Sequence, residues 1–506
     1  YADVIANIKK DFGPDWNLQA NIGASINNVK SNTMTYGGPI QEDGLANVFN
    51  VFDLDNVKSR ATKSGWNDET QSVFASVEIG WKKMLYLTLT GRNDWASQLA
   101  GSSSEKSGFF YPSVGLSWVP TSHWELGPVT YLKLRGSIAE VGMPYQRFLT
   151  IETYEYDATA RIWKDKTHYP IGDLKPENTR TYEIGLETRL WQDFSLNASW
   201  YLADTFNQTF DPQLAPSSTY STIYLQTGSV RNTGIELALG YGHQWGKFGW
   251  DSNFTWAWNK NRIRNLAEGA VNPVTGEPLN IEELRIKGLG KAMYILKKGG
   301  SLGDLYTTSG IAANENGYIE LNDEGKPIMT ETDTEIYLGS VFPRYNLAWR
   351  NDFSFAGVRL GVLFSGRIGG ICYSATQASL DLYGVSEASA AARDAGGVLV
   401  NGRDWVDPQQ WYQAIGSQSG LPQYYKYSAT NFRLQELSLG YTLPKKWFRN
   451  IMSATVSLVG HNLWMIYCKA PFDPEAVATT GNNYQGIDYF MMPSLRRIGF
   501  NVKLNF

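Results

Sequence analysis

Apolar and polar residues alternate one by one along much of this chain, and this alternation limits its possible folds more than any other feature. The segment 235–241 reads Ile-Glu-Leu-Ala-Leu-Gly-Tyr, and the segment 498–506 reads Ile-Gly-Phe-Asn-Val-Lys-Leu-Asn-Phe. A period of two is typical of β-strands whose two faces meet different surroundings. The chain is therefore predicted to be all-β, with long strands that have one apolar and one polar face.

Fourteen segments have this pattern, and we expect them to pair as antiparallel strands. They are residues 16–27, 70–82, 84–97, 108–120, 128–142, 178–190, 193–208, 229–246, 248–264, 343–354, 357–369, 429–442, 451–466 and 494–506. A fifteenth strand is expected from Tyr1 to about Ile8. Within 429–442 the apolar residues move from even to odd positions at Gln435–Glu436, which predicts a β-bulge there.

The charged residues separate the two faces further. In the central part of the strands every charge falls on the polar face, at Glu78, Arg92, Lys133, Arg135, Glu183, Glu187, Arg189, Glu236, Arg350, Arg359 and Lys503. Arg or Lys facing lipid at the bilayer midplane costs about 2–4 kcal/mol, whereas a face in contact with water tolerates such charges. The uncharged apolar face therefore predicts strands that contact lipid on one side and a polar interior on the other.

The lengths of the connections between the strands also alternate. Short connections lie at 82–83, 191–193, 245–247 and 354–357, and long ones cover 28–69, 143–177, 209–228, 265–342, 370–428 and 467–493. Following the chain from strand to strand places all long connections on one side. Outer-membrane barrels have this asymmetry, with long extracellular loops and short periplasmic turns. We predict a transmembrane antiparallel β-barrel in the outer membrane.

The composition excludes several other classes of protein. Mean hydropathy is −0.32, and no window holds the roughly 18–20 consecutive apolar residues of a transmembrane helix. A net charge of −4 argues against the basic surface that a nucleic-acid-binding protein needs. Two cysteines, Cys372 and Cys468, are too few for a disulfide scaffold. Both follow strands on the long-loop side, so they either pair there or remain two separate thiols.

Motifs for catalysis or metal binding are weak or absent. The four histidines have no metal-ligand spacing, and Gly288–Lys291 lacks the spacing of a phosphate-binding loop. The stretch Asp53–Asn56 offers oxygen atoms for calcium but lacks the rest of a calcium-binding frame, so a polar loop is the favoured interpretation. Glu183 and Glu187 share one strand face and could act as acid and base, but such charges are common inside barrels. We expect no enzyme activity, cofactor or metal site.

Six segments resemble, in the same order, barrel motifs of the SusC-like (SusC/RagA) TonB-dependent transporters. They are YPSVGLSW at 111–118, LKLRGSIAEVG at 132–142, LKPENTRTYEIGLE at 174–187, GSVRNTGIELALG at 228–240, FRLQELSLGYTLP at 432–444, and SLVGHNLW at 457–464 followed by Asp473-Pro474-Glu475. The terminal Phe506 resembles the aromatic signal for barrel insertion. The stretch 92–97 departs from the family's usual Arg-x-Asp-Gly-Ser-Ser.

The number of strands leaves two architectures open. Fourteen strands could close a barrel by themselves. However, residues 9–15 look like the end of an incoming strand followed by a turn. Plugged outer-membrane transporters have twenty-two strands, eight more than these fourteen. We therefore expect residues 1–506 to be the C-terminal part of such a barrel, with eight strands, a plug and an N-terminal extension before Tyr1.

The resemblance implies a function in nutrient import through the outer membrane. A SusD-like lipoprotein would close the extracellular mouth as a lid, and the TonB complex would supply energy through the N-terminal part. Substrates of the family are mostly oligosaccharides and in some members peptides, and the sequence does not distinguish them. A surface receptor or adhesin without import is a second hypothesis, and an outer-membrane hydrolase is a third.

Two aromatic, amide-rich loops are the best candidates for substrate binding. The candidate residues are Asp404, Trp405, Trp411, Tyr412, Tyr424, Asn482, Asn483, Tyr484, Asp488 and Tyr489, in the loops 401–427 and 482–490. Sugar rings stack on aromatic side chains and their hydroxyls pair with amides and carboxylates. Alternatively, these loops pack on each other or on the lid. Six tryptophans at strand ends are expected to form interface girdles instead, namely Trp81, Trp95, Trp118, Trp191, Trp200 and Trp245.

Overall fold

The computed structural model describes the whole chain except residues 42–49, 56, 144–146, 158–161, 165–167, 172–173, 211–221, 267, 269–270, 272–275, 279–280, 418–419, 478, 480–483 and 506. Two compact units can be distinguished. Unit 1 contains Tyr1–Gly115, Ala139–Asn178 and Asp211–Gln226, and unit 2 contains Leu116–Ile138, Thr179–Phe210 and Thr227–Phe506. The terminal Phe506, which resembles an insertion signal, lies outside the described residues.

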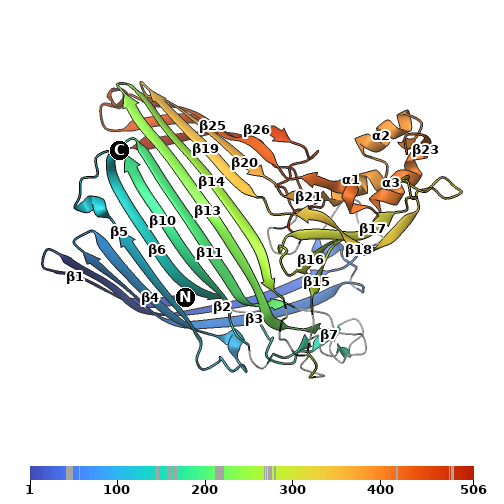
Figure 1. Cartoon of the computed structure of the whole chain (residues 1–506), viewed down its shortest axis with the longest axis horizontal. Helices are drawn as coiled ribbons and strands as arrows, with labels where there is room; N and C mark the ends of the chain where they lie inside the picture. Colours follow the sequence, from blue (N-terminus) through green and yellow to red (C-terminus); the bar gives the residue numbers. More distant parts are fainter. Residues whose placement is uncertain are drawn as a thin grey trace. The chain divides into compact units, whose positions relative to one another are not determined.

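A sheet of fifteen strands dominates the described chain (Figure 1). In sheet order the strands are β1 (Ala2–Phe12), β2 (Trp16–Gly37), β3 (Arg60–Trp81), β4 (Leu85–Ala96), β5 (Phe109–Trp118), β6 (Val129–Met143), β10 (Glu177–Leu190), β11 (Phe194–Phe210), β13 (Leu225–Trp245), β14 (Phe248–Asn265), β19 (Tyr345–Phe355), β20 (Val358–Ile368), β25 (Asn431–Leu443), β26 (Ser453–Cys468) and β28 (Arg497–Asn505). Each of the fourteen predicted strands is confirmed, and the fifteenth at the N-terminus is longer than predicted.

The remaining elements lie in the connections. The short strands are β7 (Glu155–Asp157), β8 (Ile162–Lys164), β9 (His168–Tyr169), β12 (Thr222–Ile223), β15 (Glu283–Leu289), β16 (Ala292–Lys297), β17 (Asp304–Ile311), β18 (Met329–Ser340), β21 (Ile371–Ser374), β22 (Val398–Val400), β23 (Asp404–Val406), β24 (Lys426–Ser428) and β27 (Ile487–Asp488). The helices are α1 (Ala375–Leu382), α2 (Glu387–Asp394), α3 (Pro408–Gly416) and the 3₁₀ turns η1 (Val51–Asp53), η2 (Ser97–Leu99), η3 (Pro120–Ser122), η4 (Pro422–Tyr425) and η5 (Lys445–Phe448). None of the helices described is both long enough and apolar enough to span a membrane.

The strand register of unit 2 aligns the apolar residues in rows across the sheet. One row runs through Leu239, Phe254, Trp349, Phe364 and Leu434, each paired with the next on the neighbouring strand. Because paired residues point to the same face, these rows form one continuous apolar face. The predicted separation of the two faces is therefore present in the sheet.

The predicted β-bulge in β25 is confirmed and preserves that face. Phe364 pairs with Leu434 and Leu363 with Glu436, so Gln435 is the extra residue on β25. The extra residue shifts the parity by one. Leu434 before the bulge and Leu437 after it therefore both lie on the apolar face.

One polar pair lies within the apolar face of unit 2. Ser252 and Asn351 face each other across β14 and β19. The indole N–H of Trp250 donates to Asn351 Oδ1 (3.1 Å), and that of Trp349 donates to Ser252 Oγ (3.0 Å). Two tryptophans thus satisfy the side chains of Ser252 and Asn351, which lowers the cost of placing them next to lipid.

The connection predicted at 28–69 is shorter than expected, and that prediction was wrong. β2 continues to Gly37 and β3 begins at Arg60, and the two strands stay paired throughout. The side chains of this extension are mostly exposed on both faces. Where both faces of a strand meet water, alternation is not required, so the sequence pattern ends before the strand does.

Candidate functional site

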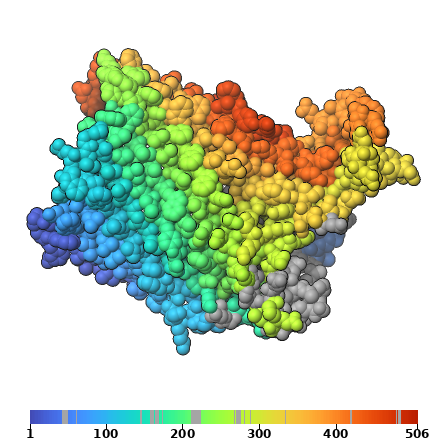
Figure 2. All heavy atoms as spheres, viewed as in Figure 1, coloured from blue at the N-terminus to red at the C-terminus, as the bar shows by residue number. Residues whose placement is uncertain are grey.

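Three long connections of unit 2 fold together into one loop assembly. The four-stranded sheet β15–β18, the helices α1–α3 and the short sheet β24-β21-β27 belong to it. Figures 1 and 2 show α1–α3 in orange beside β17 and β18 in yellow. The buried side chains of their common core are Ala292, Tyr294, Leu305, Leu338, Val341, Tyr373, Ala375, Ala378, Val400, Val406, Trp411, Ile415, Leu421, Tyr425 and Ile487. The loops expected from sequence thus contain a hydrophobic core of their own.

Buried polar contacts fix the geometry of the loop assembly. Ser374, which is completely buried, donates to Asp488 Oδ2 (2.6 Å) and accepts from the backbone N–H of Gln377 at the start of α1 (3.0 Å). Asp381 accepts from Tyr425 Oη (2.9 Å) and from Gln377 Nε2 (3.2 Å). Burial and the neighbouring Asp381 raise the pKa of Tyr425, which therefore keeps its proton and its hydrogen bond. Each of these buried carboxylates has a partner, as a packed interior requires.

Four of the predicted binding residues lie in or against this core. Trp411 is only 6% exposed, and Asp488 only 5%. Tyr412 and Tyr484 pack against the same core. In this arrangement their side chains hold the loop assembly together. Asn482 and Asn483 lie outside the described residues.

Other predicted residues remain accessible. Trp405 is 61% exposed, Tyr489 52% and Tyr424 44%, and the ring of Tyr424 lies edge-on to that of Trp411 with centroids 6.1 Å apart. Asp404 accepts from Asn401 Nδ2 (3.1 Å) and forms an ion pair with Arg403 at 3.4 Å. The structure therefore divides the predicted set into packed and accessible residues.

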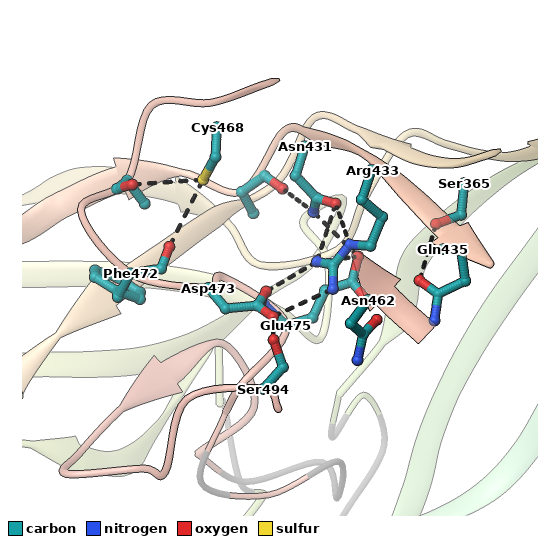
Figure 3. Close-up of polar contacts among 12 residues, drawn as sticks. Ser365, Asn431, Arg433, Gln435, Asn462, Cys468, Phe472, Asp473, Glu475 and Ser494 are labelled. Atoms are coloured by element: carbon teal, nitrogen blue, oxygen red, sulfur yellow. Dashed lines mark hydrogen bonds and ion pairs between the residues drawn. The ribbon is translucent and has the colours of Figure 1, made fainter. Parts of the chain in front are cut away.

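A buried ion pair between β25 and the last long connection has no counterpart among the predictions (Figure 3). The guanidinium of Arg433 donates to Asp473 Oδ1 and Oδ2 at 2.9 and 3.2 Å, and it lies 3.3 Å from Glu475. Arg433 also donates to Asn431 Oδ1, and the Asn431 amide donates to Glu475. The side chains of Arg433 and Asp473 are only 6% and 7% exposed. We call Asn431, Arg433, Asp473, Glu475 and Ser494 the loop latch.

The hydrogen bonds of the loop latch decide the charge of its acid. Burial raises the pKa of the Asp473 carboxyl, but hydrogen bonds from Arg433, from Ser494 and from the Glu475 N–H outweigh burial and bring the pKa below its usual range. Asp473 is therefore ionised at neutral pH. Two of the sequence motifs that carry the resemblance, 432–444 and Asp473-Pro474-Glu475, meet here. Each of the two motifs contains a charged residue, and these charges were the available signal for the ion pair. Nothing in the sequence indicated that the two residues contact each other.

An exposed apolar segment lies between two anchor points of the loop assembly. Before it, Asp488 is bound to Ser374, and the Phe490 N–H donates to Thr376 Oγ1 (2.6 Å). Near its other end, Ser494 donates to Asp473 of the loop latch. The exposed apolar side chains of 489–495 are Tyr489, Phe490, Met491, Met492 and Leu495. We call 489–495 the rim segment; it offers an apolar surface that is held in place rather than collapsed onto the core.

The polar face of the strands carries ion pairs. Arg135 bonds Glu183 (3.0 Å), and Arg350 bonds Asp352 (2.6 Å) and Glu436 (3.3 Å). Glu183, considered above as an acid or base, is thus engaged by a cation. In the part of the chain that the structure describes, no group of three His, Cys, Asp or Glu residues is arranged to hold a metal ion.

The two cysteines are free, so the pairing that the sequence left open is not formed. Cys372 is buried, and burial raises the pKa of its thiol to about 12. The thiol of Cys468 points to the carbonyl oxygens of Ala470 (3.5 Å) and Phe472 (3.6 Å).

Long antiparallel strands with an uncharged apolar face, an ion-paired polar face and elaborate loops on one side define an outer-membrane β-barrel of the receptor and transporter type. Residues 3–463 match the family described as TonB dependent receptor-like, beta-barrel. The chain belongs to this family and is located in the outer membrane. The predicted β-barrel fold, the membership of the TonB-dependent receptors and the outer-membrane location are confirmed.

Named relatives agree with this assignment. The chain is 24% identical to TonB-dependent receptor P3 of Formosa agariphila over 485 residues, 87% of this chain and 46% of that protein. It is 22% identical to TonB-dependent receptor P39 of the same organism over 267 residues, covering 50% and 24%. The chain thus spans less than half the length of the relatives it matches.

Solved structures share the fold. The RagAB peptide importer in its open-open state matches 100% of this chain and 54% of that chain, with a TM-score of 0.75 and 16% identity. A second structure of the RagAB peptide transporter gives a TM-score of 0.73 and 17% identity. At such low identity the similarity concerns the fold alone.

Proposed function

We propose that this chain is part of a TonB-dependent importer that takes up oligosaccharides with the help of a SusD-like surface lipoprotein. The observation that carries the proposal is the rim segment, an exposed aromatic and apolar stretch held by a buried hydrogen bond just before it and by the Ser494–Asp473 hydrogen bond near its other end. A preorganised surface loses little conformational entropy when it binds a ligand. Energy from TonB would act through an N-terminal part of the protein outside residues 1–506.

Oligosaccharide is the leading substrate class because accessible aromatic rings stand next to polar groups. Tyr489, Tyr424 and Trp405 expose ring faces that can stack on sugar rings. Asp404 and its amide partner Asn401 supply acceptors and donors for hydroxyls beside Trp405.

A peptide is the second candidate, and a different observation favours it. Phe490, Met491 and Met492 present exposed apolar side chains. Methionine adapts to apolar side chains of varied shape, which suits peptides better than sugars. The structural relatives named as RagAB peptide importer or transporter are consistent with this alternative.

For the exposed hairpin β22–β23, contact with a lid protein is the alternative to contact with a sugar. Trp405 (61% exposed) and Leu399 (50% exposed) face each other across this hairpin in register. An exposed aromatic and aliphatic pair at a loop tip is typical of protein contacts. Binding of the lipoprotein would cover both side chains.

Uptake measurements distinguish these alternatives. We expect cells with the full-length protein to accumulate labelled oligosaccharides in a TonB-dependent manner, and a deletion strain to lose this accumulation. Accumulation of labelled peptides alone would favour the second candidate. Surface binding that persists without TonB, with no accumulation of either class, would favour the receptor or adhesin hypothesis and contradict import.

A further inference from the structure

Three basic residues follow the apolar face of β14 beyond its last aromatic residue. Along this strand Trp256 and Trp258 occupy even positions of the apolar face, and the next even positions are Lys260, Arg262 and Arg264. All three are exposed. We call them the basic stripe. Within the described residues no ion pair or side-chain hydrogen bond is found for any of them.

Side chains on the opposite face of the same segment pack against the loop assembly, and this shows on which face of the strand the basic stripe lies. Ile263 is completely buried in a small core with Val230, Leu266, Leu284 and Leu296. The side chain of Asn261 accepts a hydrogen bond from the Leu302 N–H (2.9 Å). Asn261 and Ile263 thus face the loop assembly, and Lys260 and Arg262 lie on the other face of the strand, which carries Trp256 and Trp258. Arg264 is the extra residue of a β-bulge, because Val230 pairs with Ile263 and Ser229 with Asn265, and its side chain is exposed.

The height of the stripe follows from the geometry of the strand. Aromatic residues bound the apolar stretch of β14 at both ends, with Phe248 at the short-turn end and Trp258 at the other. At about 3.3 Å per residue and a tilt of about 45°, this stretch is about 23 Å tall, close to the apolar band of an outer-membrane barrel. Lys260 to Arg264 then lie about 5 to 14 Å above Trp258 on the long-loop side, at the level of the lipid headgroups.

The neighbouring strand does not supply a free counter-charge. In the register of β13 and β14, Arg262 pairs with Arg231. Arg231 is itself engaged by Asp204 through two hydrogen bonds of 2.6 and 2.7 Å. Glu268 is the acidic residue nearest in sequence to the stripe among the described residues. Its carboxylate lies 3.3 Å from the ammonium group of Lys298. These two acids are therefore already engaged by other cations and do not neutralise the basic stripe.

From these observations we propose that the basic stripe binds the phosphate groups of a phosphorylated glycolipid of the outer leaflet, such as the lipid anchor of lipopolysaccharide. Charge complementarity identifies the occupant, because unpaired cations at headgroup level attract anionic headgroups by about 1 kcal/mol each, and guanidinium groups bind phosphate oxygens in pairs. The aromatic residues directly below contact the acyl chains. The proposal depends on the outer-membrane location and not on the substrate.

Native mass spectrometry of the full-length protein with purified lipid A tests the proposal. We expect the triple variant K260Q/R262Q/R264Q to bind lipid A about fivefold more weakly per lost cation, roughly a hundredfold in total. The matched control K247Q/K445Q/K446Q removes three exposed cations from the short-turn side and should bind like the wild type. Lipid A from which phosphate has been removed should bind to the wild type as weakly as intact lipid A binds to the triple variant.

Three outcomes would overturn the proposal. They are unchanged binding by the triple variant, equal losses in the triple variant and its control, and equal binding of the dephosphorylated lipid. Thermal unfolding without added lipid checks that the triple variant is folded. If it is not, the single variant R262Q should still bind lipid A about fivefold more weakly, and wild-type binding by this variant also contradicts the proposal.

Discussion

Replacement of Arg433 by alanine should release the last long connection from the strands while leaving the sheet folded. The substitution leaves the Asp473 carboxylate, whose side chain is 7% exposed, without its bidentate cation. Removing one partner of a buried ion pair costs about 3–5 kcal/mol. We expect this cost to appear as local opening of residues 469–496, because these residues are tied to β25 by the loop latch, whereas β25 keeps its backbone pairing with β20 and β26.

Hydrogen exchange measured peptide by peptide is the appropriate assay. A loss of about 3–5 kcal/mol accelerates exchange in the segment by roughly two to four orders of magnitude where exchange reports the opening equilibrium. Exchange in β25 and β26 should change much less. The double variant R433M/D473L removes both charges at similar volume and should recover much of the protection. As a control, Lys326→Ala breaks an exposed ion pair with Glu324 and should leave exchange in 469–496 unchanged.

The reasoning would be refuted if R433A changed protection in 469–496 no more than the control does. It would also be refuted if the double variant were as open as the single one. The first result would mean that the loop latch contributes no stability. The second would mean that lost packing, and not an unpaired buried charge, causes the opening.

The remaining predictions concern the membrane faces, the rim segment and the pH below which the loop latch loses its stabilising effect. Leu237→Arg places a charge on the lipid face, should cost about 2–4 kcal/mol and should impair barrel assembly, whereas Glu236→Arg should be tolerated. The fraction of folded barrel can be measured by heat-modifiable mobility in gels. Equal effects of the two substitutions would contradict the face assignment. Tyr489→Ala should lower substrate uptake severalfold at unchanged surface expression, and unchanged uptake would remove this residue from the site. Because the pKa of Asp473 is lowered in the folded state, its stabilising contribution is present above the unfolded pKa of about 3.9 and is lost as the pH falls through the folded value. Protection of 469–496 should therefore stay constant from neutral pH to about pH 5 and fall below about pH 4, and a loss near pH 6 would contradict the assignment.

The strands were predictable because the membrane imposes a rule on each of them. Lipid contact requires an uncharged apolar face, so the period of two is strict wherever a strand crosses the bilayer. The same rule explains the one clear error. Residues 28–37 and 60–69 extend β2 and β3 into water, where no face has to be apolar, and their sequence reads like a loop.

The candidate site was less predictable because its contacts join distant residues. Arg433 and Asp473 are 40 positions apart, and Ser374 and Asp488 are 114 apart. No local period records such a pairing. Composition drew attention to the aromatic loops, but it did not distinguish Trp411, which fills the core, from Tyr489, which is exposed. Burial depends on tertiary packing that a single sequence does not display.

The position of the loop latch also bears on which parts of the protein can move. Arg433 belongs to a strand of the sheet, and Asp473 belongs to the connection that carries the rim segment. Asp488 ties the other end of that segment to Ser374 beside α1. The rim segment is therefore joined both to the strands and to the loop assembly, and a large displacement would have to break a buried ion pair. Because that step costs several kcal/mol, we expect this part of the mouth to stay fixed during uptake, and any large opening motion to involve other segments or the proposed lipoprotein partner.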